Sequence, residues 1–247
     1  MSYLLETRKP HEAIRARVGA QTAVDRVSLH VPEGAVYGLL GPNGAGKSTV
    51  LKMVAGMLHP TEGDILLDGR PWRRGDLYRI GALIETPPVY PNLTAWENLR
   101  VRATLLGVSE SRIGEVLQTV DLTATGKKRA GQFSMGMKQR LGIALALLGC
   151  PRLLILDEPT NGLDPIGIEE LRGLIRSLPQ QGVTVVVSSH ILTEVSHTAD
   201  HVGIIAEGCL AHEGELAPGA DLERLFMDVC RRVAVERGAA GEDGGVR

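Results

Sequence analysis

The stretch Gly41-Pro42-Asn43-Gly44-Ala45-Gly46-Lys47-Ser48-Thr49 decides the fold of this 247-residue chain. A short apolar run, residues 35–40, comes directly before it, and apolar residues recur at helical spacing after it, over residues 48–58. The pattern therefore predicts a strand, a glycine-rich loop and a helix, in that order. In such a loop the glycines let backbone N–H groups turn inward around an anion, which also faces the positive end of the helix dipole. We expect this loop to bind phosphate.

The side chains of the loop predict that the phosphates belong to a nucleotide. Lys47 is placed to reach the β- and γ-phosphates, Ser48 to ligate Mg²⁺, and Thr49 to add a hydroxyl or backbone donor. We therefore expect ATP and Mg²⁺ as cofactors. The residues predicted to contact the nucleotide are Asn43, Gly44, Ala45, Gly46, Lys47, Ser48 and Thr49.

Two adjacent carboxylates, Asp157 and Glu158, follow the continuous apolar run of residues 153–156. Such a run is typical of a buried parallel strand, and open α/β sheets bind their ligands beyond the carboxyl ends of these strands. We predict that Asp157 helps to hold Mg²⁺ and that Glu158 orients and deprotonates an attacking water. The alternative is a pair of surface acids at a strand end, which the phosphate loop upstream disfavours.

The order of the remaining segments predicts an α/β fold. A second apolar strand is expected over residues 183–187, a helix over 166–178 lies between the two strands, and Glu207-Gly208 marks a hairpin between residues 202–206 and 209–213. Ser134 is placed to cap a helix over residues 135–148.

The chain is predicted to form one domain over residues 1–247, with a core of mainly parallel sheet and an antiparallel β edge. The core is expected at about residues 1–85 and 146–220. The proline-rich turns of residues 85–94, followed by a helical region over 95–121, predict a helical lobe at about 86–145. The glycine-rich end, residues 238–247, is expected to be a disordered tail.

Five motifs in one order resemble those of ATP-binding-cassette (ABC) transporter ATPases, with the similarity covering about residues 25–214. Besides the phosphate loop and the two acids, these are Phe133-Ser134-Met135-Gly136-Met137-Lys138-Gln139-Arg140, Asn161-Gly162-Leu163-Asp164 and Ser188-Ser189-His190. The resemblance implies a P-loop NTPase fold with a helical subdomain, and ATP hydrolysis coupled to transport.

The resemblance also implies roles and partners. Ser134 and Gly136, at a helix N-terminus, would contact the γ-phosphate held by an opposite subunit, and His190 would hydrogen-bond the γ-phosphate. Two identical or paralogous ATPase subunits would then enclose two ATP molecules and drive a separate membrane-spanning permease. Without the resemblance, Ser134 would be only a helix cap and His190 a structural histidine.

Glu85 departs from the family pattern, because most members carry glutamine at this loop between the core and the lobe. The resemblance places Glu85 near the metal and the attacking water, so we expect a catalytic and metal-binding role; an exposed acid is the alternative. The motif of residues 133–140, called the signature below, also differs from the usual family sequence, with Met135 in place of a glycine. With Glu85 and this signature, the chain resembles the branch that exports, or confers immunity to, lantibiotics, bacitracin and related antimicrobial peptides.

The adenine side of the site also departs from the family pattern. Val18 stands where members usually carry an aromatic residue that stacks on adenine, and the loss of stacking would cost about 1–3 kcal/mol. We therefore predict comparable affinities for ATP and GTP, measured by competition for the same site. A strong preference for ATP would contradict this prediction.

The composition limits which partners the protein is expected to bind and where in the cell it is expected to lie. A net charge of −2 and a pI near 6.4 give no general attraction for nucleic acid, and the basic clusters at 73–74 and 127–129 are expected to be solvated surface. Three scattered cysteines and apolar runs well short of ~20 residues predict a cytoplasmic protein. The resemblance implies that its permease holds it at the inner face of the cell membrane. Two alternatives remain: a soluble ABC ATPase acting on ribosomes or DNA, and a regulator that binds nucleotide without cycling.

Overall fold

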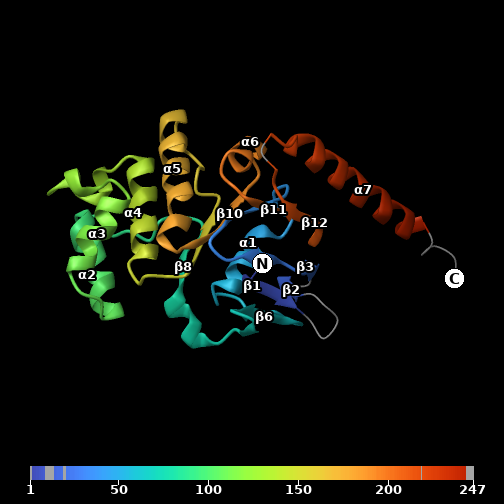
Figure 1. Ribbon diagram of the computed structural model, residues 1–247, viewed down its shortest axis with the longest axis horizontal. Helices are drawn as coiled ribbons and strands as arrows, with labels where there is room; N and C mark the ends of the chain where they lie inside the picture. The colour runs from blue at the N-terminus through green and yellow to red at the C-terminus, as the bar shows by residue number, and fades with distance from the viewer. Residues whose placement is uncertain (1, 9–13, 19–20, 218, 243–247) are drawn as a thin grey trace.

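The computed structural model of the chain describes residues 2–8, 14–18, 21–217 and 219–242 (Figure 1). Its main sheet has six strands in the order β12-β11-β5-β10-β9-β8, and neighbouring strands are parallel except at the β11–β12 edge. This arrangement confirms the predicted parallel sheet with an antiparallel edge. The strands are β5 (Val36–Leu40), β8 (Ile80–Leu83), β9 (Leu153–Asp157), β10 (Thr184–Ser189), β11 (His201–Ala206) and β12 (Cys209–Glu215).

A second layer, which the sequence pattern did not predict, is built mostly by the N-terminal part of the chain. An antiparallel sheet in the order β4-β1-β6-β7 and the hairpin of β2 and β3 pack on the same side of the main sheet as α1 (Lys47–Val54). The buried residues Val50, Leu51, Met53 and Val54 place α1 in this core. The strands are β1 (Tyr3–Arg8), β2 (Ile14–Val18), β3 (Gln21–Val27), β4 (His30–Pro32), β6 (Asp64–Leu67) and β7 (Arg70–Pro71).

The other face of the main sheet is covered by helices. In β9, Leu153 and Ile155 belong to the core around α1, whereas Leu154 and Leu156 belong to the core shared with the helices. This division follows from the alternation of side chains along a strand. The helices are α2 (Ala95–Leu106), α3 (Ser111–Thr119), α4 (Met135–Leu147) and α5 (Pro165–Ser177), and Figure 1 shows α2, α3 and α4 together as the lobe.

Local sequence signals explain where these helices begin and end. Ser134 and Asp164 cap α4 and α5 by accepting hydrogen bonds from the N–H groups of the first turn, and Pro165 occupies the first position of α5. The region predicted as helical over residues 95–121 is two helices, because Gly107 ends α2 in a left-handed conformation. Short 3₁₀ helices also occur at Arg74–Arg79, Thr123–Thr125, Ala130–Gln132 and Pro179–Gln181.

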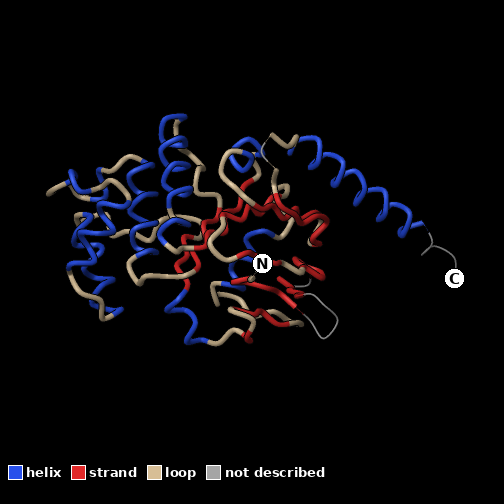
Figure 2. Tube along the Cα trace, in the orientation of Figure 1, coloured by secondary structure: helices blue, strands red, loops and turns tan. Residues whose placement is uncertain are grey.

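The C-terminal helix α7 (Leu222–Glu242) projects from the body of the molecule (Figures 1 and 2). Leu222 and Val229 anchor it in a third apolar cluster, together with Val195 of α6 (Leu192–Ser196). The helix continues to Glu242 and so includes residues 238–242 of the segment predicted as a disordered tail. A helix that is already established can extend in this way, because each added residue gains one backbone hydrogen bond. Residues 243–247 of that segment lie outside the described part of the chain. Of the described helices, none combines the length and apolar character needed to cross a bilayer.

Candidate active site

The phosphate loop connects β5 to α1 and is shaped by close backbone contact. Gly46, the N-cap of α1, has a φ of 108°, and a Cβ atom there would lie 2.7 Å from the carbonyl oxygen of Ala23. A side chain is therefore excluded by both conformation and space. Lys47 is 5% exposed, and its Nζ donates to the carbonyl oxygens of Gly41 (2.7 Å) and Pro42 (3.2 Å). Its ammonium group thus lies within the loop.

Asp157, at the end of β9, is joined to the loop through hydroxyl groups. Its Oδ1 accepts from Ser48 Oγ at 3.1 Å and from Ser188 Oγ at 2.6 Å, and the side chain is 5% exposed. The two hydrogen bonds offset part of the cost of burying the carboxylate. A hydroxyl and a carboxylate are hard oxygen ligands of the kind that Mg²⁺ takes together with substrate phosphates. The pair Ser48 and Asp157 therefore fits the predicted metal.

Glu158 turns out of the strand with a φ of 48° and faces different partners. Its carboxylate lies 3.4 Å from Lys47 Nζ, and its Oε2 accepts from Asn161 Nδ2 at 2.9 Å and from His190 Nδ1 at 2.6 Å. A carboxylate only accepts hydrogen bonds, so the Nδ1 of His190 carries the proton.

These contacts keep Glu158 ionised. Partial burial opposes the charged form, but hydrogen bonds from Asn161 and His190, with the charges of Lys47 and His190, hold the pKa of Glu158 below its ordinary value. The group is therefore a carboxylate at neutral pH.

Ser188 is a residue of this site for which the sequence predicted no role. Besides donating to Asp157, its Oγ accepts from the backbone N–H of Glu158 at 2.9 Å, so one hydroxyl connects both acids. The register of β10 against β9 pairs Ser188 with Asp157. The signal in the sequence was a serine at the end of a predicted strand, but only the strand pairing shows what it faces.

Glu85 follows β8 and forms a different pair. The carboxylate of Glu85 accepts a hydrogen bond from Lys52 Nζ at 2.6 Å, and the Glu85 side chain is 66% exposed. Lys52 lies on α1, one helical turn beyond Ser48. The hydrogen bond and charge of Lys52 hold the pKa of Glu85 below its ordinary value. In this structure Glu85 thus pairs with α1, and its predicted contact with the metal and the water stays a prediction.

Ser134 and Gly136 lie on a separate surface of the molecule. The Oγ of Ser134 accepts from Met137 N at 3.2 Å, which is the predicted capping bond. Both residues line an open cavity of about 700 Å³, together with Gly162, Leu163 and Asp164. The structure therefore joins Lys47, Ser48, Asp157, Glu158 and His190 in one network and places the signature elsewhere. Val18 ends β2, and its side chain lies outside what the structure describes.

Comparison with known proteins decides the family. The model of the ABC transporter family matches residues 24–161. The chain is 51% identical over 213 residues to the lantibiotic transport ATP-binding protein SrtF of Streptococcus pyogenes, an alignment covering 86% of this chain and 93% of that protein. The chain belongs to the ABC transporter ATP-binding family. It is accordingly an ATP-binding and ATP-hydrolysing subunit of the kind that ABC transporters use, and the predicted fold and activity are confirmed.

Two further proteins are similar to the chain, one in sequence and one in fold. The bacitracin transport ATP-binding protein BcrA of Bacillus licheniformis is 51% identical over 200 residues, which cover 79% of this chain and 65% of BcrA. A dimeric ATP-binding cassette in a post-hydrolysis state, bound to ADP and Pi, superimposes with a TM-score of 0.73 at 26% identity, over 86% of this chain and 99% of that one.

Proposed function

We propose that this ABC ATPase hydrolyses ATP through the network that joins the phosphate loop to Asp157, Glu158 and His190. The observation that carries the proposal is the different pairing of the two acids. Asp157 is held by hydroxyl groups, and Glu158 is held by Lys47, Asn161 and His190. The first environment suits a metal ligand, and the second suits a base that is ionised yet placed among cations.

Each step is assigned to residues of the chain. The N–H groups of the loop and the Lys47 ammonium bind the β- and γ-phosphates. Ser48 and Asp157 would hold Mg²⁺, which when bound offsets phosphate charge. Glu158 orients a water and takes its proton as the water attacks the γ-phosphorus; the bond from that phosphorus to the bridging oxygen breaks, and ADP leaves with the electron pair. His190, positioned by the bond of its Nδ1–H to Glu158, can donate to a γ-phosphate oxygen from Nε2 in its protonated form.

The active unit is proposed to be a dimer. Ser134 and Gly136 present a hydroxyl and the N-terminal end of α4 in an open cavity whose lining includes neither Lys47 nor Glu158. A signature so placed is available to the phosphates bound by a second subunit. The dimeric cassette bound to ADP and Pi, which shares this fold, supports that arrangement.

The partner is proposed to be a membrane-spanning permease that docks beside Glu85. A groove of about 230 Å³ lies between the turns after β8 and helices α2 and α4. Leu105, 77% exposed, and Tyr90, 55% exposed, present apolar surface at this groove. Docking there would hold the subunit at the inner face of the membrane, and the names of SrtF and BcrA support an antimicrobial peptide as the exported substrate.

The test of the catalytic assignment is Glu158→Gln. The variant should bind ATP with an affinity within a few-fold of the parent and lose roughly a hundredfold or more in kcat, since the amide cannot accept the proton of water. Glu223→Gln, at an exposed position of α7, is the matched control and should leave turnover unchanged. Undiminished hydrolysis by Glu158→Gln would remove Glu158 from this role.

A further inference from the structure

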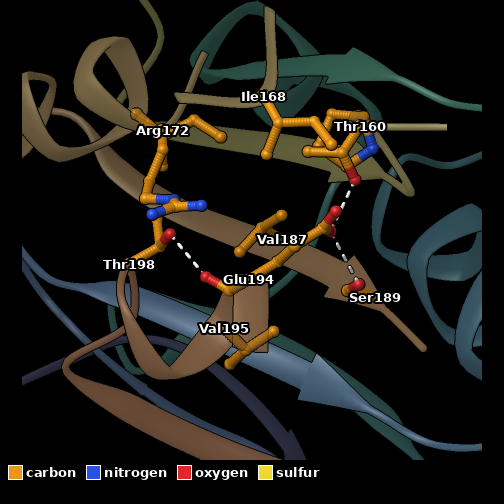
Figure 3. Close-up of a pocket in the computed structure, with 10 residues that line it drawn as sticks. Thr160, Ile168, Arg172, Val187, Ser189, Glu194, Val195 and Thr198 are labelled. Carbon is orange, nitrogen blue, oxygen red and sulfur yellow. Dashed lines mark hydrogen bonds between the residues drawn. The ribbon is translucent and has the colours of Figure 1, made fainter. Parts of the chain in front are cut away.

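A third carboxylate, Glu194 of α6, connects the chain segments that carry Glu158 and His190. Its Oε2 accepts a hydrogen bond from Thr160 Oγ1 at 2.6 Å and another from Ser189 Oγ at 3.1 Å (Figure 3). Thr160 comes two residues after Glu158, and Ser189 comes directly before His190. The carboxylate therefore joins both segments through hydrogen bonds that are separate from the direct Glu158–His190 contact.

The surroundings of Glu194 favour strong hydrogen bonds. The carboxylate of the half-buried Glu194 lines a small cavity of about 20 Å³, whose wall includes the apolar side chains of Ile168, Val187 and Val195 (Figure 3). Hydrogen bonds to a charged acceptor are about twice as strong as neutral ones, and a low local dielectric strengthens them further.

Thr160 and Ser189 also make hydrogen bonds within the turns of their own segments. Ser189 Oγ accepts from the N–H of Ile191, which bends the chain just after His190. The carbonyl oxygen of Thr160 accepts from the N–H of Leu163, within the turn that follows Glu158. A shift of the Glu194 carboxylate would therefore move both turns, and not only two side chains.

We propose that Glu194 is a positioning residue for ATP hydrolysis, which sets Glu158 and His190 at hydrogen-bonding distance by holding Thr160 and Ser189 together. The inference rests on the proposed catalytic roles of Glu158 and His190. It predicts that the loss of Glu194 slows the chemical step and leaves nucleotide binding at the phosphate loop intact, because the loop makes none of these bonds.

The experiment compares Glu194→Met, which keeps the length of the side chain without an acceptor, with Glu194→Gln, which keeps an acceptor oxygen. Glu194→Met should lower kcat about tenfold or more, since small displacements of reacting groups are costly, while KM for ATP stays within about twofold. Glu194→Gln should recover most of the lost kcat. Ser196→Ala, at an exposed position of the same helix, is the matched control and should keep the parent kcat.

Thr160→Val and Ser189→Ala remove one donor each and test the same connection if Glu194→Met fails to fold. Each should lower kcat with KM unchanged. Thr160→Val combined with Glu194→Met should be no slower than Glu194→Met alone, because Glu194→Met already breaks the hydrogen bond that Thr160→Val removes.

Three results would overturn the proposal: an unchanged kcat in Glu194→Met, a rise in KM without a fall in kcat, or a loss of activity that only follows the fraction of unfolded protein in a thermal melt. Glu158→Gln is measured alongside. If Glu158→Gln is inactive and Glu194→Met is fully active, the positioning role fails and the proposed function stands. If Glu158→Gln remains active, the proposed function itself fails.

Discussion

At the scale of single residues, two neighbouring carboxylates acquire different chemistry from their partners. Asp157 still belongs to β9, whereas Glu158 adopts a left-handed backbone conformation that non-glycine residues seldom adopt, and its side chain turns toward Lys47 and His190. Ser188 secures this turn because it bonds to both residues. The strained backbone at Glu158 therefore helps to turn its side chain away from Asp157, which fits their different proposed roles as base and metal ligand.

The low pKa of Glu158 predicts how Asn161 contributes. Asn161→Ala removes a hydrogen bond to the ionised form and should raise the pKa of Glu158 toward its ordinary value. NMR titration of labelled glutamate carboxyl groups, with Glu158→Gln used to assign the signal, measures this shift.

The lowered pKa of Glu158 also makes the stability of the fold depend on pH in a defined direction. A carboxyl group whose pKa is lowered by folding stabilises the protein above its unfolded-state pKa, and this stabilisation disappears as pH falls through the lower, folded-state value. The parent should lose this stabilisation as the pH falls from the unfolded-state pKa of Glu158 through its folded-state pKa. Asn161→Ala should lose it at a higher pH, because its folded-state pKa is higher. An unchanged titration in Asn161→Ala would contradict the assigned cause.

At the scale of secondary-structure elements, the contact of β8 with α4 joins the core to the lobe. A Cβ atom on Gly81 of β8 would lie 2.4 Å from the carbonyl oxygen of Ala146, and one on Gly142 of α4 would lie 3.0 Å from Leu83 and Pro87. The helix and the strand therefore approach so closely that a side chain is excluded at Gly81 and crowded at Gly142. Since β8 leads directly to Glu85 and to the proposed docking groove, this contact would set how the lobe is presented to the proposed permease.

Gly81→Ala should destabilise the protein, because the added methyl group meets a backbone atom that cannot rotate away. We expect the free energy of unfolding to fall by about 1–3 kcal/mol, measured by urea denaturation. Gly114→Ala is the control: a Cβ there meets nothing within 4 Å, and the position lies inside α3. Its expected effect is a gain of about 0.5–1 kcal/mol. Equal stabilities for the two variants would show that β8 and α4 can move apart freely.

At the scale of the whole molecule, the residues proposed for the site fall into two groups. The phosphate loop network and the cavity of Ser134 and Gly136 share no lining residue with each other. Under the proposed function, a complete site therefore needs two subunits, and ATP favours the closed dimer by binding it more tightly than the open one.

This division predicts a nucleotide-dependent change of mass. Glu158→Gln with MgATP should become a dimer in analytical ultracentrifugation, because bound ATP is not consumed. Adding Ser134→Arg places a large cation at the N-terminal end of α4 and should keep the protein monomeric while ATP still binds. Dimers that form equally well without nucleotide, or with Ser134→Arg, would contradict the shared site.

Much of the site could be predicted because its signals are local. The phosphate loop, the strand that ends at Asp157 and the Ser134 cap each depend on neighbours within a few residues, and the backbone conformations they require follow from glycine freedom, apolar periodicity and capping bonds. Glu158 was predicted from the same strand end, and the resemblance to a family added a role for His190; the hydrogen bond between these two residues is shown only by the tertiary structure.

The sequence by itself determined that an anion-binding loop precedes a helix and that acids end a buried strand. Only the tertiary structure decided that Glu85 pairs with Lys52, that Ser188 links both acids, and that Glu194 joins Thr160 to Ser189. Apart from the bond between Ser189 and Glu194, these contacts connect residues about 30 positions apart. They depend on which strands are neighbours and in what register, and that is set by the packing of the whole core rather than by any short stretch of the chain.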